Sequence, residues 1–130
     1  MMVFDTDVCI ELLRGNIKII EHRQKQPDAV AITFMTVGEL YYGAYKSNNY
    51  DKNRLLIEQF SLSVHIIHST YQIMREFGRL KSLLAGQGFG LADADLLIAA
   101  TALVHQGRLI TGNLKYFERI PELVIENWLR

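Results

Sequence analysis

Short apolar runs alternate with amphipathic stretches along the whole chain. Five of the runs have the length and the content of β-branched or bulky apolar residues that are typical of buried strands. These expected strands cover residues 2–4, 29–33, 63–67, 108–111 and 123–125. Between them, apolar positions recur at helical spacing, which predicts helices in the intervening segments.

The intervening segments also carry start and stop signals for helices. Ser69 and Gln72 form a capping-box pattern and predict the start of the longest helix, which ends at the glycine-rich residues 86–90. Pro27 stops the second helix. The expected helices are a stretch that ends at Leu13, then residues 17–26, 36 towards 45, 51–60, 69–86, 93–105 and 115–118.

Short apolar strands that alternate with helices are typical of a parallel sheet buried on both faces. The pattern therefore predicts an α/β fold, a three-layer α/β/α sandwich with a central, mostly parallel sheet. The length of 130 residues fits one domain over residues 1–130, and no repeat or linker-like tract divides the chain.

Composition narrows the function. Fourteen basic residues balance fourteen acidic ones, so the chain does not bind nucleic acid through bulk charge and would need a local patch or a bound metal. The single cysteine, Cys9, excludes an internal disulfide, and no Cys/His cluster has structural-zinc spacing. The acidic N-terminus does not resemble a signal peptide, and no apolar run is long enough to span a bilayer. We expect no membrane association and an intracellular, most simply cytoplasmic, location.

Acidic and hydroxyl side chains stand where the expected strands lead into helices. Asp5 and Asp7 follow the first strand, and Glu39 lies in the first turn of the helix after the second. Asp95 opens the helix after the glycine-rich loop, and Thr111 and Asn113 follow the fourth strand.

Parallel strands bring their carboxyl ends to one edge, so these carboxylates can converge there. Converging carboxylates repel each other unless a cation lies between them, and a hard divalent ion such as Mg²⁺ or Mn²⁺ prefers oxygen ligands. Such an ion can activate a water molecule and neutralise charge on a phosphodiester. The pattern indicates metal-dependent hydrolysis of phosphodiester bonds.

Helix capping is the competing explanation for each acid taken alone, because Asp, Ser and Thr satisfy free N–H groups at helix starts. Thr36 with Glu39 has capping-box spacing, and we interpret Asp93 as an N-cap. Asp7 is left open as a helix-start acid or as an auxiliary group beside the metal. Capping does not explain why so many junctions on one edge are acidic.

Four blocks of the chain resemble, in the same order, those of PIN-domain nucleases, and they are most similar to VapC toxins of toxin–antitoxin pairs. The blocks are VFDTD with IELLR (3–7 and 10–14), TVGELYYGA (36–44), ADLLIAATAL (94–103), and LITGN with FERIP and ENW (109–113, 117–121 and 126–128). By position, the resemblance implies that Asp5, Glu39 and Asp95 are metal ligands, with Asp7 as a possible auxiliary one.

The resemblance also assigns Thr111 to a catalytic hydroxyl position near the metal and Asn113 to a place where many PIN domains carry a fourth acid. A neutral amide there leaves the number of metal ions open, and Asp7 stands where Asn is commoner. The family implies a Mg²⁺- or Mn²⁺-dependent endoribonuclease with an RNA substrate. It also implies homodimerisation and a small antitoxin whose tail enters the acidic cleft.

Two other functions remain to be tested. Asp5-Thr6-Asp7 after a strand also resembles the start of haloacid-dehalogenase phosphatases, but no suitable acidic pair follows Lys115. The third possibility is a PIN-like module that has lost activity and only binds. Arg14, Arg75 and Arg79 are candidates for RNA phosphate contacts, although a solvated helix face is the simpler interpretation of the last two.

Overall fold

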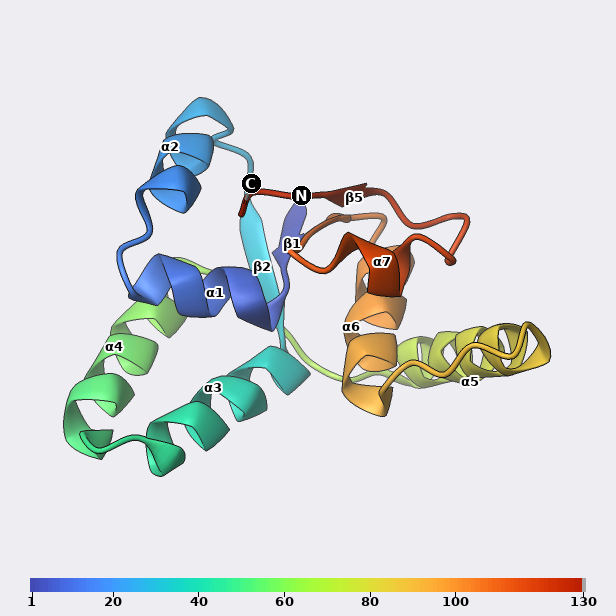
Figure 1. The fold of residues 1–130 in the computed structure, drawn as a ribbon, viewed down its shortest axis with the longest axis horizontal. Coiled ribbons are helices and arrows are strands. Elements are labelled where there is room, and N and C mark those ends of the chain that lie inside the picture. The colour runs from blue at the N-terminus through green and yellow to red at the C-terminus, as the bar shows by residue number, and fades with distance from the viewer. Residues whose placement is uncertain (130) are drawn as a thin grey trace.

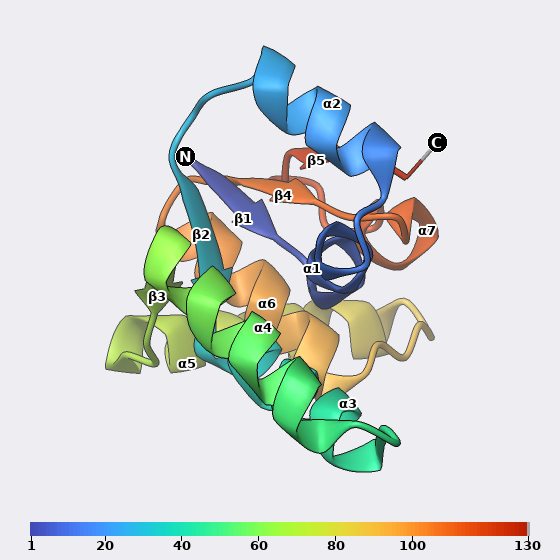
Figure 2. The same cartoon turned by 90° about the vertical axis from the view of Figure 1, so that its left-hand side faces the viewer.

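The computed structural model describes residues 1–129, and its centre is a sheet of five parallel strands. The strands are β1 (Met2–Phe4), β2 (Val30–Thr33), β3 (His65–Ile67), β4 (Arg108–Ile110) and β5 (Ile125–Glu126). Their order across the sheet is β3-β2-β1-β4-β5, and each neighbouring pair is parallel. The carboxyl ends of all five strands therefore lie on the same edge of the sheet, as Figures 1 and 2 show for the strands nearest the centre.

Seven helices cover the two faces of this sheet. They are α1 (Thr6–Leu13), α2 (Ile17–Lys25), α3 (Phe34–Lys46), α4 (Tyr50–Ser63), α5 (Tyr71–Gly86), α6 (Asp93–Val104) and α7 (Leu114–Phe117). Helices α1 to α4 pack on one face, and α5 to α7 pack on the other. The α/β/α sandwich expected from the sequence is confirmed.

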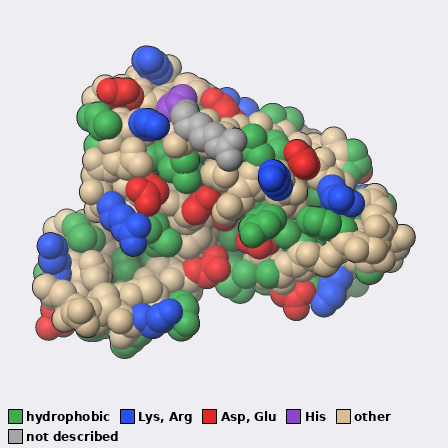
Figure 3. All heavy atoms as spheres, in the orientation of Figure 1, with side chains coloured by type: hydrophobic (Ala, Val, Ile, Leu, Met, Phe, Trp, Pro, Cys, Tyr) green, Lys and Arg blue, Asp and Glu red, His purple; other side chains and the backbone are tan. Residues whose placement is uncertain are grey.

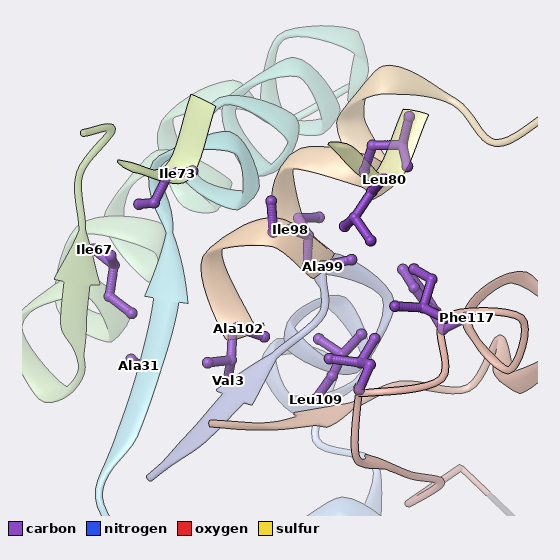
Figure 4. Packing of buried hydrophobic residues seen from close by; sticks show 14 of the residues in the cluster. Val3, Ala31, Ile67, Ile73, Leu80, Ile98, Ala99, Ala102, Leu109 and Phe117 are labelled. Carbon is purple, nitrogen blue, oxygen red and sulfur yellow. The ribbon is translucent and has the colours of Figure 1, made fainter. Parts of the chain in front are cut away.

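The alternation of side chains along β1 divides the core in two. Val3 points to the α5–α6 side, where it joins Ala31 and Leu109 beneath α6 (Figure 4). Met2 and Phe4 point to the other side and pack with the residues of α1 to α4. Because both faces are covered, β1 is fully buried and reads in the sequence as a continuous apolar run.

The C-terminal segment after β5 is fixed by a cluster of side chains that we call the tail cluster, made of Gln26, Asp28, Arg108, Glu126 and Trp128. The Arg108 guanidinium donates to Asp28 and to Glu126, each at 2.8 Å. Glu126 also accepts from Gln26 at 2.8 Å and from the Trp128 indole at 3.1 Å. Trp128 is fully buried, with its ring stacked on His22 and at the edge of Phe4.

Three of the expected helix N-caps are wrong by one to three residues, although α6 begins at Asp93 as expected. Helix α5 is capped by Thr70, whose hydroxyl accepts from the Ile73 N–H, and not by a Ser69–Gln72 box. Helix α3 begins at Phe34 with Thr33 as its N-cap. Thr36 is therefore inside the helix, and Glu39 lies in the second turn instead of the first. The N-cap of α6 is Ala92, and Asp93 is its first helical residue.

Four of the five strands are shorter than expected: β2 and β4 each lack one terminal residue, and β3 and β5 differ more. Residues 63–67 were expected as a strand, but α4 continues through Ser63, and β3 begins only at His65. The last strand covers Ile125–Glu126 instead of 123–125, because the Leu123 N–H donates to Ile120 in a turn. Among the described residues, no helix combines the length and the apolar character needed to cross a bilayer.

Candidate active site

Asp5 is at the centre of the carboxyl edge of the sheet, directly after β1. Its side chain caps α1, since Oδ1 accepts from the Thr6 N–H at 2.8 Å. Its other oxygen, Oδ2, accepts from the Thr111 hydroxyl at 2.8 Å, across from the end of β4. The residue is only 4% exposed. Asp5 thus both caps a helix and lies in the predicted site, so the two explanations of this acid do not exclude each other.

Asp7 reaches from α1 to the turn that follows β4. Its Oδ2 accepts from the Gly112 N–H at 2.9 Å and from the Asn113 side-chain amide at 3.1 Å. Its Oδ1 accepts from the Val8 N–H at 2.8 Å. The structure therefore brings Asp7 and Asn113 into direct contact.

Glu39 on α3 is connected to α1 by a hydrogen bond from the Thr6 hydroxyl, which also contacts the Thr36 hydroxyl. The Thr6 hydroxyl lies 2.6 Å from Glu39 Oε1, to which it donates, and 3.0 Å from the Thr36 hydroxyl. Sequence reasoning assigned no role to Thr6 and interpreted Thr36 only as a helix cap. A signal was present, since both hydroxyl residues lie close to the ends of buried strands.

Asp95 lies in the first turn of α6 and is partly buried. Burial, followed by the charges of Glu39 and Asp7, raises the pKa of its carboxyl above the usual range. Asp93, two residues earlier, is exposed and accepts from the Lys81 ammonium at 3.0 Å. Only the second of these two acids shares the electrostatic environment of the α1 and α3 carboxylates.

The four carboxylates Asp5, Asp7, Glu39 and Asp95 form what we call the acidic site. Burial, followed by the charge of Asp7, raises the pKa of Asp5 to about 7, although hydrogen bonds from Thr111 and Thr6 act in the opposite direction. Burial also raises the pKa of Asp7. In the described part of the chain, no Lys, Arg or His forms an ion pair with any of the four. The acidic site is an uncompensated concentration of negative charge.

The donor set of this site suits a hard divalent cation, because it consists of carboxylate oxygens, and a positive ion would lower the raised pKa values of Asp5, Asp7 and Asp95. The side chains do not form a finished coordination shell: within residues 1–129, no group of three or more His, Cys, Asp or Glu is placed to hold an ion. Unneutralised carboxylates repel each other, and Glu39 is engaged by Thr6. The structure brings these carboxylates to one edge of the sheet, and their shared coordination of an ion stays a prediction.

An apolar groove of about 260 Å³ adjoins the acidic site. It lies among α1, α3 and α4 and is lined mainly by Ile10, Leu13, Leu40, Ala44, Leu56 and Ile57. Glu39 and Arg14 also line it, so the groove joins the acidic site to a basic residue. On this face of the molecule, acidic side chains gather in the middle and basic ones lie around them (Figure 3).

The three arginines considered as RNA contacts lie in different places. Arg75 and Arg79 line a hollow with Leu103 and Val104, at the C-terminal end of α6, whereas Asp95 is at its N-terminal end. Arg79 is also paired with Glu76 at 2.6 Å. These two arginines do not border the acidic site. Arg14 does lie beside it and is 3.2 Å from Glu11.

The parallel sheet with carboxylates at its carboxyl edge is the arrangement of a known class of protein. The family model described as "PIN domain" matches residues 2–123, and the chain belongs to this family.

Within the family, the chain is similar to VapC ribonucleases. It is 34% identical over 131 residues to Ribonuclease VapC1 of Haemophilus influenzae (strain R2866), with 98% of each chain covered. It is 30% identical over 127 residues to the tRNA(fMet)-specific endonuclease VapC of Salmonella typhimurium, covering 97% of this chain and 96% of that one.

Solved structures give the same result. VapBC2 from Rickettsia felis, bound to a DNA fragment from its promoter, superposes with a TM-score of 0.91 at 28% identity, covering 98% of both chains. VapBC-1 from nontypeable Haemophilus influenzae superposes with a TM-score of 0.90 at 33% identity, covering 99% of this chain and 98% of that one.

Proposed function

We propose that this protein is an endoribonuclease that hydrolyses RNA phosphodiester bonds and is the toxin component of a type II toxin–antitoxin pair. The observation that carries the proposal is the acidic site at the carboxyl edge of a PIN fold, where the pKa values of Asp5 and Asp95 are raised and no basic side chain of residues 1–129 pairs with the carboxylates. The similarity to VapC ribonucleases over almost the whole chain supports the same activity.

Ribonucleases of this family generally depend on a divalent metal, and we assign Mg²⁺ or Mn²⁺ here. Asp5, Glu39 and Asp95 are the proposed ligands, with Asp7 as an auxiliary acid. The ion would supply an activated water molecule and positive charge against the scissile phosphate.

The protein's own residues orient the acids of the site. The Thr111 hydroxyl and the Thr6 N–H hold the two oxygens of Asp5 in one direction, and Thr6 also holds Glu39. Thr111 and Asn113 belong to the site through these contacts with Asp5 and Asp7. A polyanion such as RNA is repelled by the bare site, so a bound cation is needed before phosphate can approach. Arg14, beside Glu39 in the groove, is the basic residue placed to contact the RNA backbone.

A cognate antitoxin is the expected protein partner, because the similar solved structures include VapBC complexes. We propose that its tail enters the acidic site, and the adjoining apolar groove supports this placement. Coexpression tests it: growth arrest caused by this chain should be relieved by the product of a neighbouring gene. Loss of RNA cleavage on mixing the two purified proteins would identify the same contact.

We also propose a homodimer. Tyr42 and Tyr45 are 64% and 71% exposed on the same helix, α3, and large exposed aromatics are typical of interfaces. Light scattering of the purified protein gives the mass directly. A monomer at micromolar concentration, or a dimer that Tyr45→Glu does not weaken, would contradict this placement of the interface.

The activity is tested with purified protein, total RNA and Mg²⁺ or Mn²⁺, followed by sequencing of the new RNA ends. Asp5→Asn and Asp95→Asn should remove cleavage while the circular dichroism spectrum stays unchanged. Asp51→Asn is the matched control, since Asp51 is an exposed acid in the first turn of α4. Wild-type cleavage by both site variants would refute the assignment.

The two alternatives give different results in the same experiment. A phosphatase of the haloacid-dehalogenase type would form a covalent aspartyl-phosphate on Asp5, which mass spectrometry detects. A module that only binds RNA would shift its mobility without producing new ends. Retention of Asp5, Glu39 and Asp95 in one uncompensated site favours the nuclease over both.

A further inference from the structure

We propose that Asp7 and Asn113 are a positioning pair, in which Asp7 holds the turn after β4 so that Thr111 fixes Asp5, and that Asp7 is not itself a metal ligand. This inference rests on the proposed nuclease function and refines the role of one of its residues.

Helix α1 holds one side of the turn through Asp7. Asp7 Oδ2 accepts from both the Gly112 N–H at 2.9 Å and the Asn113 amide at 3.1 Å, and these residues lie more than one hundred positions away in the sequence. Its other oxygen is engaged by the Val8 N–H. Both oxygens thus face neutral N–H donors, which is the environment of a structural acceptor.

The contact between Asp7 and Asn113 affects the orientation of Asp5 through the Thr111 hydroxyl. The Asn113 backbone N–H donates to Thr111 Oγ1 at 3.0 Å, so this oxygen must direct its own proton elsewhere. The proton goes to Asp5 Oδ2 at 2.8 Å. The chain of contacts Asp7–Asn113–Thr111–Asp5 therefore sets the direction in which Asp5 presents its carboxyl.

At Gly112 the turn packs closely against Asp7 and Leu129. A Cβ at this position would lie 2.9 Å from Asp7 Oδ2 and 2.3 Å from Leu129 Cδ1. No side chain fits between α1 and the C-terminal segment, so the Gly112 backbone can approach Asp7 only because this residue is glycine. The turn therefore packs against Asp7 on one side and against Leu129 on the other.

The role of the Asp7–Asn113 pair can be tested by exchanging its hydrogen-bond donor and acceptor. Asn113→Asp replaces the donor by an acceptor and places two carboxylates within hydrogen-bond distance, so we expect kcat to fall roughly 10- to 100-fold. The double variant Asp7→Asn/Asn113→Asp restores one donor and one acceptor between the two positions. Its amide group then takes the place of the Asp7 oxygen that accepts from the Gly112 N–H, so it should recover only part of that loss. Asp7→Asn alone keeps an oxygen for the Gly112 N–H and should lose less activity than Asp7→Ala.

A metal-ligand role for Asp7 predicts the opposite order. An added acid at position 113 would then leave cleavage unchanged or improve it, and Asp7→Asn would weaken Mn²⁺ binding as much as it weakens cleavage. Either result would overturn the proposal. Calorimetric titration of Mn²⁺ into each variant measures the binding, and Asn49→Asp is the charge control, because it adds one acid while keeping the cap of α4.

A readout independent of catalysis separates this proposal from the proposed function. The Gly112 amide proton, hydrogen bonded to a carboxylate, should resonate downfield and move upfield in Asn113→Asp and, more strongly, in Asp7→Ala, which removes the acceptor. If the wild-type protein does not cleave RNA and these shifts occur, the nuclease assignment fails while the pair stands. If Gly112 does not respond to any change at position 7, the pair fails.

Discussion

The acidic site and the tail cluster are both built from carboxylates beside the central strands, yet their electrostatics are opposite. In the tail cluster, Arg108 lies 2.8 Å from both Asp28 and Glu126. Burial tends to raise the pKa of Glu126, but hydrogen bonds from Gln26 and Trp128, with the charge of Arg108, lower it overall. In the acidic site, burial raises the pKa of Asp5 to about 7, and no guanidinium of residues 1–129 opposes it.

The comparison shows that the acids of the tail cluster, which hold the C-terminal segment in place, are paired with a basic residue. Arg108 pairs with the acids that hold the C-terminal segment, whereas within residues 1–129 no basic side chain pairs with the four carboxylates of the acidic site. Groups kept in an unfavourable charge state are typical of functional sites, where a ligand provides the compensation. This contrast is the physical reason for proposing a cation at the acidic site.

The largest expected effect is on RNA cleavage, which should depend on the acidic site and not on the tail cluster. Asp5→Asn or Asp95→Asn should lower RNA cleavage by about a hundredfold or more, because each removes an acid from the metal site. Asp28→Asn, the same change in the tail cluster, should leave the cleavage rate unchanged at temperatures well below unfolding. Rates under single-turnover conditions provide the measurement, and equal losses in all three variants would erase the distinction.

The pH dependence of stability should also distinguish the acidic site from the tail cluster. Asp5 keeps its proton in the native state up to about pH 7, whereas in the unfolded chain it ionises near its ordinary pKa of 3.8. The native state binds more protons between these values, so without metal its stability falls as the pH rises through this range. The full difference is about 3–4 kcal/mol at most. Urea unfolding with a chelator at pH 5 and pH 8 measures it.

Asp5→Asn is the control for this second prediction, since it removes the titrating group. The variant should be more stable than the wild type at pH 8 and similar to it at low pH. Added Mg²⁺ should narrow the gap by stabilising only the wild type. A variant with the same pH dependence as the wild type would mean that Asp5 is not the source.

A smaller loss is expected when the compensation in the tail cluster is removed. Arg108→Met keeps the aliphatic part of the side chain but leaves Asp28 and Glu126 without their partner. Because Arg108 is about one third exposed, the cost should be only about 1–2 kcal/mol in the free energy of unfolding. Denaturant titration at pH 7 provides the value. Stability unchanged within error would show that the guanidinium does not hold the tail.

The smallest effect is expected at the surface. Arg79→Gln removes ion pairs with Glu76 and Glu122, which are solvent exposed, and should change stability by about 0.5 kcal/mol or less. It should not alter the KM for RNA, since Arg79 lies at the far end of α6 from Asp95. Arg14→Gln is the matched change beside the acidic site and should raise KM. A raised KM in Arg79→Gln instead would reinstate this helix face as an RNA contact.

The elements could be predicted from the sequence because burial dictates their pattern. A strand covered on both faces must be apolar throughout, which identified β1 and β2 almost to the residue. Helix starts were less predictable, because two candidate caps often stand within three positions. Ser69 and Thr70 can both accept from a free N–H, and only the backbone conformation decides that Thr70 does.

The site was predictable in its location, since parallel strands share one edge, and less so in its detail. Asp93 and Asp95 are two positions apart on a helix and face different directions. The partner that separates them, Lys81, comes from another helix. The contact of Asp7 with Gly112 joins distant segments, and no local pattern indicates it. Such contacts depend on the packed fold, which a linear pattern does not contain.

The seating of Leu129 against Gly112 has a practical consequence for handling the protein. An affinity tag fused at the C-terminus would begin one residue beyond a side chain that grips the active-site turn, and could pull that turn out of place. A tag before Met1 would instead start at the amino edge of the sheet, where the Met1 carbonyl accepts from Arg108, away from the acids. Purification through the N-terminus is therefore the choice that preserves the native rate.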